Sequence, residues 1–138
     1  QDRIEKVSNK ITNIVESGSV LTFLGLSFKP NTDDIRESSS IKIAFYLFEK
    51  GYKINCYDPK AMANAKKEYD KFNYFDSAHE ACNNADAIII GTEWNEFRAL
   101  NFPEISKIVK NKKIFDLRNI YNASELERIG FEYYGTGK

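Results

Sequence analysis

The sequence predicts an α/β domain in which a doubly wound parallel sheet is covered by helices on both faces, a three-layer arrangement. Short apolar runs that are typical of buried strands alternate along the chain with segments of helical periodicity. This alternation implies right-handed crossover connections, which produce a parallel sheet. About six strands are expected, and they fit the order 3-2-1-4-5-6.

The expected elements follow from apolar spacing and from the residues that start and stop them. The strands are expected at 20–25, 53–57, 72–75, 87–91, 113–116 and 131–134. The helices are expected at 2–17, 41–50, 61–69, 77–84, 102–110 and 124–129. Ser38 or Ser39 can cap the second helix, and Gly51 ends it. Three consecutive isoleucines make 87–91 the clearest strand.

The helix at 2–17 is additional to the alternating pattern, because it precedes the first strand. Its apolar residues recur at helical spacing, so this stripe must cover either the sheet or a neighbouring part of the protein. A chain of 138 residues is expected to form one domain. We therefore expect an amino-terminal helix over 1–18 and a single domain over 19–138. The first residue is Gln1 rather than Met, which hints at a piece of a longer protein.

Composition excludes several classes of protein. Twenty Lys plus Arg balance twenty Asp plus Glu, which argues against a nucleic-acid binder because such proteins normally carry a basic excess. The longest apolar run, 87–90, is far too short to cross a bilayer, and no signal peptide opens the chain. A protein with no membrane and no nucleic-acid partner is therefore expected.

The two cysteines and the one histidine do not suggest a catalytic or metal site. Cys56 and Cys82 lie in an expected strand and an expected helix without CxxC spacing, which suggests packed thiols and a reducing, cytoplasmic location. His79 is expected to face solvent in a helix, and no second or third soft ligand stands at a spacing suited to a metal. No nucleophile, base and orienting group can be assembled, so no catalytic residue is expected in this chain.

Cations in separate loops point to an anion-binding site. In a doubly wound sheet the ligand crevice opens at the carboxyl ends of the first and fourth strands, where the winding reverses. The loops expected at that edge contain Phe28, Lys29, Asn31, Thr32, Asp33, Arg36, Thr92, Glu93, Trp94 and Arg118. Lysine and arginine form strong, charge-assisted hydrogen bonds with anions, so a diphosphate would suit this edge.

Each of these residues also has a purely structural interpretation. Lys29 and Arg36 could be solvated or could pair with the nearby acids Asp33, Asp34 and Glu37, and Arg118 could pair with Asp116. Such surface pairs are common and contribute little stability. Only the shared edge of the sheet favours the binding site.

The sequence argues against NAD binding in the usual manner. The turn after the first strand, Gly25-Leu-Ser-Phe-Lys29, lacks the second and third glycines of a Rossmann fingerprint. Asp58 ends the second strand, where an acid would hold a ribose hydroxyl in a dinucleotide site. Without those glycines it is equally suited to capping the following helix.

Four segments together resemble the carboxyl-terminal, UDP-binding domain of the UDP-glucose/GDP-mannose dehydrogenase family. They are GLSFKPNTDDIRESSS at 25–40, YDP at 57–59, ADAIIIGTEW at 85–94 and FDLR at 115–118. They run in family order and span nearly all of the chain after Gly18. The fold implied is Rossmann-like, and the form FKPNTDD looks most like the family members that act on UDP-glucose.

The resemblance implies an enzyme of three parts. An amino-terminal domain binds NAD, a central helical region mediates dimerisation, and this domain closes over the sugar nucleotide. The reaction oxidises the sugar C6 alcohol to a carboxylate in two hydride transfers, through a thiohemiacetal on a cysteine in the region that precedes this domain. Neither Cys56 nor Cys82 matches that cysteine. A homodimer or larger assembly is implied for the full-length protein.

The resemblance also assigns roles to residues. Phe28, Lys29 and Arg118 look like contacts to the sugar nucleotide, and Arg36 looks like the residue that reaches across the cleft toward NAD. Thr32, Asp33, Glu93 and Trp94 are possible cleft residues. The leading hypothesis is the substrate-binding domain of an NAD-dependent UDP-glucose dehydrogenase that forms UDP-glucuronate.

Three alternatives stay open: a dehydrogenase of another nucleotide sugar, such as a UDP-N-acetyl sugar or GDP-mannose; a stand-alone nucleotide-binding module without catalysis; and, more weakly, an assembly domain that uses the apolar stripe of 2–17.

Overall fold

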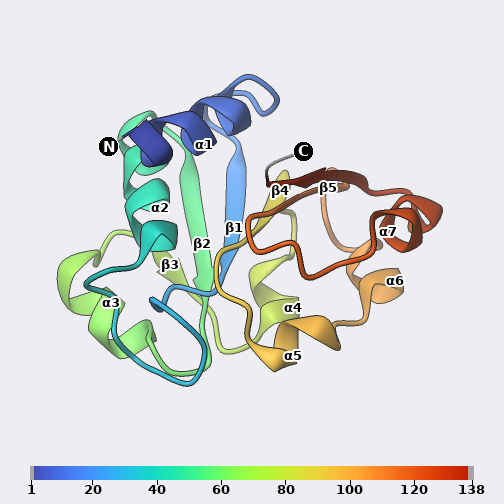
Figure 1. The fold of residues 1–138 in the computed structure, drawn as a ribbon. Helices are drawn as coiled ribbons and strands as arrows, with labels where there is room; N and C mark the ends of the chain where they lie inside the picture. The colour runs from blue at the N-terminus through green and yellow to red at the C-terminus, as the bar shows by residue number, and fades with distance from the viewer. Residues whose placement is uncertain (1, 137–138) are drawn as a thin grey trace.

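The computed structural model describes residues 2–136 and shows a six-stranded sheet in the order β3-β2-β1-β4-β5-β6 (Figure 1). Every neighbouring pair is parallel. The strands are β1 (Val20–Leu24), β2 (Lys53–Tyr57), β3 (Asn73–Tyr74), β4 (Ala87–Ile90), β5 (Lys113–Asp116) and β6 (Glu132–Gly135). The predicted fold class and strand order are confirmed.

Seven helices connect or flank the strands in the described part of the chain. They are α1 (Asp2–Thr12), α2 (Ser39–Glu49), α3 (Met62–Glu68), α4 (Ala78–Ala81), α5 (Asn95–Arg98), α6 (Phe102–Ile105) and α7 (Ala123–Ile129). Ser38, one of the two predicted caps, accepts a hydrogen bond from the Ile41 backbone N–H and so caps α2. None of these helices is both long and apolar enough to span a membrane.

Several helices are shorter than the sequence predicted, and the helix expected at 2–17 ends at Thr12. The helix expected at 77–84 ends early because Asn84 takes a left-handed conformation with φ of 61°. The helix expected at 102–110 stops at Ile105, since the segment beyond it forms backbone hydrogen bonds with the residues that precede β4 instead. There the Asn84 N–H donates to Ile108 and the Lys110 N–H donates to Ala85. The single turn α5 was not predicted.

Alternating side chains divide the core between the two faces of the sheet. Leu21, Phe23 and Ile89 face the layer formed by α1, α2 and α3. Leu24 and Ile88 face the layer formed by α4, α5, α6 and α7. Figure 1 shows the two groups of helices on opposite sides of the strands. Because both faces are covered, the central strands are apolar at nearly every position.

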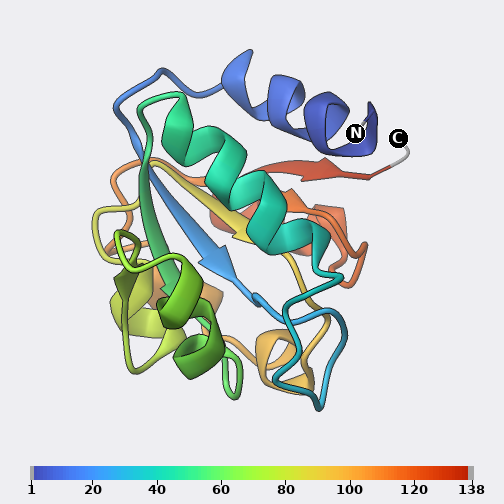
Figure 2. The same ribbon diagram turned by 90° about the vertical axis from the view of Figure 1, so that its left-hand side faces the viewer.

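The apolar stripe of α1 covers this same domain. Ile11 at its end and Val15 just beyond are buried in the core beneath it. Figure 2 shows α1 lying across α2 on one side of the sheet. The Lys10 ammonium group also donates to the Gly135 carbonyl oxygen at 2.9 Å, which ties α1 to β6. Of the two possibilities left open for this stripe, packing on the domain itself is observed.

Candidate functional site

The loops that follow β1, β4 and β5 meet at the carboxyl edge of the sheet. Arg118 Nε, after β5, donates to the carbonyl oxygen of Gly91, after β4, at 3.0 Å. Thr92 Oγ1 in turn donates to the carbonyl oxygen of Ser27, after β1, at 2.8 Å. Lys29 lies two residues beyond Ser27, so a continuous chain of contacts joins the loop of Lys29 to that of Arg118.

Close backbone packing makes this junction possible. Gly25 has φ of 97°, and a side chain there would approach Thr92 to 2.6 Å. The Ser40 hydroxyl group, in the first turn of α2, donates to the Gly25 carbonyl oxygen at 2.7 Å. The first and fourth strands and the start of α2 therefore come together without space for additional side-chain atoms.

Asp58, at the end of β2, anchors two of the loops at this edge. Its Oδ2 accepts hydrogen bonds from the backbone N–H groups of Leu26 at 2.7 Å and Ser27 at 3.1 Å. The Ser27 hydroxyl group and the Trp94 indole N–H lie 3.2 and 3.3 Å from the same oxygen. The Asp58 side chain is completely buried. A single carboxylate thus connects the loop after β1 with the loop after β4.

The other oxygen of Asp58 resolves the two roles that the sequence left open. Oδ1 accepts from the backbone N–H groups of Lys60 at 2.9 Å and Ala61 at 2.8 Å, just before α3. The residue therefore fixes the turn that leads into α3, and both of its oxygens are occupied by protein donors. A buried carboxylate in this condition does not fit the role of a ribose ligand.

The loop at 28–36 presents two of the predicted contact residues to solvent. Phe28 is 43% exposed, which is unusual for a large apolar side chain, and Lys29 is exposed beside it. The Lys29 ammonium nitrogen lies 5.9 Å from the centre of the Phe28 ring. Figures 1 and 2 show this loop at the end of the sheet where β1 terminates. Both side chains are thus available to a ligand.

Arg36 is paired within its own loop, which realises one of the structural alternatives. Its Nε and Nη2 donate to the two carboxylate oxygens of Asp34 at 3.1 and 3.0 Å. The hydrogen bonds from Arg36 lower the pKa of the Asp34 carboxyl group to about 2. The Arg36 side chain is still 84% exposed, so the pair leaves most of this side chain open to a ligand.

Thr32 and Asp33 lie in the same loop, and their contacts in the structure stabilise its conformation. Thr32 Oγ1 accepts from the Asp34 backbone N–H at 3.2 Å. The carbonyl oxygen of Asp33 accepts from the Asn64 side chain on α3 at 2.9 Å. A cavity of about 500 Å³ lies between this loop and α3, and Thr32, Asp33, Arg36 and Asn64 are among its lining residues.

The guanidinium group of Arg118 contacts Glu93 rather than Asp116. Its Nε lies 3.5 Å from Glu93 Oε1, and only its backbone N–H donates to Asp116, at 3.1 Å. The buried Asp116 carboxylate also accepts from the Tyr121 backbone N–H and from the Tyr133 hydroxyl group. Asp116 therefore fixes the turn that carries Arg118 and leaves the guanidinium beside Glu93.

Trp94, a possible cleft residue, is placed differently from the others. It is only 7% exposed, and its indole N–H donates to Ser27 and Asp58. Its position supports the loop after β1 from within. Of the residues that the resemblance assigned to the site or its cleft, Trp94 alone is buried. The others are exposed (Phe28, Lys29, Asp33 and Arg36) or half-buried (Thr32, Glu93 and Arg118).

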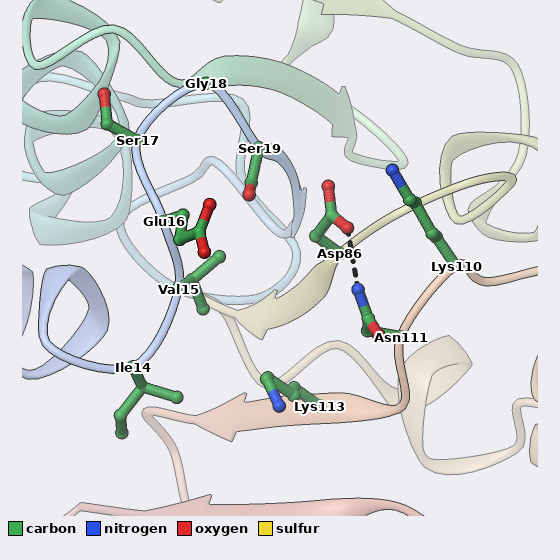
Figure 3. Close-up of a pocket in the computed structure, with 10 residues that line it drawn as sticks. All are labelled: Ile14, Val15, Glu16, Ser17, Gly18, Ser19, Asp86, Lys110, Asn111 and Lys113. Atoms are coloured by element: carbon green, nitrogen blue, oxygen red, sulfur yellow. Dashed lines mark hydrogen bonds between the residues drawn. The ribbon is translucent and has the colours of Figure 1, made fainter.

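A second large cavity lies at the opposite edge of the sheet (Figure 3). Its volume is about 510 Å³, and Ser19, Asp86 and Lys113 place it at the amino ends of β1, β4 and β5. The Asp86 carboxylate there accepts from the Val20 backbone N–H and the Asn111 side chain. Ligands of doubly wound sheets bind at carboxyl ends, so this cavity is not the predicted nucleotide site.

The cysteines and the histidine take the positions that the sequence predicted. Cys56 and Cys82 are free and buried, and burial raises the pKa of both thiols, that of Cys82 to about 12. Thiols in this state are poor nucleophiles. His79 is exposed. No cluster of His, Cys, Asp or Glu suited to a metal ion is found among residues 2–136.

Comparison with known proteins identifies the family to which a chain with this binding edge belongs. Residues 22–123 match the model of the "UDP-glucose/GDP-mannose dehydrogenase family, UDP binding domain". The chain belongs to this family. UDP-glucose 6-dehydrogenase of Rickettsia bellii is 41% identical over 142 aligned residues, which cover 99% of the chain and 33% of the relative. UDP-glucose 6-dehydrogenase of Rhizobium meliloti is 43% identical, covering 88% of the chain and 28% of the relative.

Solved structures agree with the sequence comparison. A UDP-glucose dehydrogenase from Pyrobaculum islandicum is 26% identical, with a TM-score of 0.80 over 97% of this chain and 29% of that one. A UDP-D-ManNAc dehydrogenase from Pyrococcus horikoshii is 28% identical, with a TM-score of 0.73 over 99% of this chain and 29% of that one. The chain thus spans about a third of the length of these curated relatives and solved chains.

Proposed function

We propose that this chain is the substrate-binding part of an NAD-dependent UDP-glucose 6-dehydrogenase, which oxidises UDP-glucose to UDP-glucuronate. The observation that carries the proposal is the continuous carboxyl edge on which Lys29 and Arg118 lie, in a chain about 40% identical to UDP-glucose 6-dehydrogenases. In this proposal, residues 19–138 form the UDP-sugar domain, and the segment 1–18, whose helix α1 ends at Thr12, leads into it.

The exposed side chains of this edge suit a nucleoside diphosphate. Lys29 supplies a mobile ammonium group and Arg118 a guanidinium held by a backbone carbonyl, so together they neutralise a diphosphate from two sides. The Phe28 ring gives the ligand an apolar surface beside that charge. Glu93 lies against Arg118 and offers an acceptor to ligand hydroxyl groups.

The nicotinamide cofactor fits this chain only at the exposed loop that carries Arg36. Asp58 is fully occupied and the glycine fingerprint is missing, so the domain's own crevice is not built for a dinucleotide. The exposed guanidinium of Arg36 does fit an anionic group presented from outside the loop. NAD, which accepts the hydride, is therefore assigned to another domain of the same polypeptide, with Arg36 as a contact from this one.

The rest of the proposal concerns the whole protein. The catalytic cysteine is placed outside residues 1–138, because burial raises the pKa of both thiols here. The full-length enzyme is proposed to pair this domain with an NAD-binding domain and a central helical region, to form a dimer or larger assembly, and to work in the cytoplasm.

Alanine substitution of Lys29 or Arg118 in the full-length enzyme tests the site. Each change removes charge-assisted hydrogen bonds to the diphosphate, so the Kd for UDP measured by calorimetry should rise by about tenfold to hundredfold. Lys42→Ala and Arg128→Ala remove matched charges from exposed positions on α2 and α7 and should leave the Kd unchanged. UDP affinity equal to that of the parent in both site variants would contradict the assignment.

A dehydrogenase of another nucleotide sugar is a second candidate, because solved relatives of similar identity include a UDP-D-ManNAc dehydrogenase. Turnover of a panel of UDP- and GDP-sugars by the full-length protein separates the two. Faster turnover of UDP-glucose than of UDP-N-acetyl sugars supports the leading proposal, and the reverse order supports the second.

A further inference from the structure

Asp34 is the hydrogen-bonding centre of the loop at 28–36, although sequence analysis gave it no role in the site. Its carboxylate accepts three hydrogen bonds from Arg36: one from the backbone N–H at 2.9 Å, one from Nε at 3.1 Å and one from Nη2 at 3.0 Å. A surface pair usually contributes little because two long side chains must be ordered to form it. Here the acid is short and also holds the backbone of its partner, which reduces that cost.

The pairing leaves the arginine competent to bind an anion. A guanidinium group carries five N–H donors in one plane. Asp34 accepts from the edge formed by Nε and one N–H of Nη2, so the two N–H groups of Nη1 and the second of Nη2 remain free. Those free donors lie at the end of the side chain and match the two oxygens of a phosphate or carboxylate. Asp34 thus fixes the direction in which Arg36 presents its donors.

The backbone of Asp34 also holds the first half of the loop. Its carbonyl oxygen accepts from the Phe28 N–H at 2.8 Å, and its own N–H donates to Thr32 Oγ1 at 3.2 Å. The loop therefore folds on itself, because Asp34 is hydrogen-bonded both to Phe28 at the start of the loop and to Arg36 at its end. Because the backbone contacts do not require the carboxylate, the two functions of Asp34 can be separated by substitution.

We propose that Asp34 is a positioning residue that holds the Arg36 guanidinium in the orientation in which it binds the anionic part of the dinucleotide cofactor. This inference rests on the proposed function, since it takes Arg36 as a contact to NAD. The carboxylate orders an otherwise mobile side chain before the cofactor arrives, so ordering is not required at binding.

Steady-state kinetics of full-length Asp34→Asn test the proposal. Freeing the Arg36 side chain should raise the KM for NAD by about twofold to tenfold, the cost of ordering one flexible side chain on binding. The KM for the sugar nucleotide should change less than twofold, because the backbone link to Phe28 remains. Glu37→Gln, which removes the same charge from the exposed neighbour of Arg36, is the matched control and should leave both values unchanged.

A double-mutant cycle distinguishes positioning from a general effect on the loop. If Asp34 acts through Arg36, Asp34→Asn should change nothing further in an Arg36→Ala background. An equal increase in that background, or the same increase in Glu37→Gln, would overturn the inference. If Arg36→Ala alone leaves the KM for NAD unchanged, the proposed cofactor contact fails. If Arg36→Ala raises that KM while Asp34→Asn does not, only the positioning role fails.

Discussion

Asp58→Ala is expected to lower the free energy of unfolding by about 3–5 kcal/mol, because it leaves several buried N–H groups without an acceptor. The carboxylate accepts from four backbone N–H groups, those of Leu26, Ser27, Lys60 and Ala61, as well as from two side chains. Water cannot easily replace these bonds, since the side chain is completely buried. Chemical denaturation of the full-length protein, followed at the transition of this domain, measures the change.

The same substitution should also weaken sugar-nucleotide binding, because Leu26 and Ser27 lead directly into Phe28 and Lys29. Asp76→Ala removes an exposed aspartate and is the control for the loss of one negative charge. Asp58→Asn retains one strong acceptor and should fall between the parent and Asp58→Ala. A loss in Asp58→Ala no larger than that in the control would show that the loops after β1 and β2 are held by other contacts.

The strands could be predicted because each carries its own signal. Ala87–Ile90 is apolar at every position, as is typical of a strand covered on both faces. The alternation of strands with helices then predicts that the strands are parallel, and the doubly wound order agrees with the structure. The single turn α5 carries no comparable signal, since one buried Phe97 in four residues shows no period. The early end of α4 depends on the left-handed conformation of Asn84, and pattern alone does not reveal it.

The edge that carries the site could be predicted from topology, but the contacts within it could not. Strand order alone brings the loops of Lys29 and Arg118 to one side of the sheet. Which acid holds which cation depends on side-chain geometry. The sequence offered Asp33, Asp34 and Glu37 for Arg36, and the structure selects Asp34; Glu93 as the partner of Arg118 was not predicted. An acid two residues before an arginine in a polar loop is a weak sequence signal for the first of these pairs.

Asp58 illustrates the same limit from the opposite direction. Its place at the end of β2 was visible in the sequence, and so were its two possible roles. Deciding between them required the positions of the hydrogen-bond donors, which include Lys60 and Ala61 nearby and Leu26, distant along the chain. Sequence spacing predicts that an acid stands at a functional edge, whereas its hydrogen-bond partners show whether it is free to bind a ligand.

Gly91→Ala is expected to be at least as disruptive as the loss of Asp58, although the change adds a single methyl group. A Cβ at this position would overlap the Ser40 hydroxyl oxygen and lie 2.7 Å from the Gly25 carbonyl oxygen. Relief requires α2 or the end of β1 to shift, and forced repacking of this kind costs about 1–3 kcal/mol, and more where the backbone itself is overlapped. The shift would also displace the carbonyl oxygen that holds Arg118.

Thermal unfolding and UDP titration of the full-length Gly91→Ala protein should therefore show a lower Tm and a weaker affinity together. Gly18→Ala is the matched control, because its φ of 91° strains an alanine by about 1 kcal/mol while no atom lies within 4 Å of the added group. Ser40→Gly in the Gly91→Ala background removes the side-chain overlap and should restore part of both losses. Unchanged UDP affinity in a destabilised Gly91→Ala protein would show that the position of Arg118 does not depend on this junction, and its assignment as a diphosphate contact would then lose its structural support.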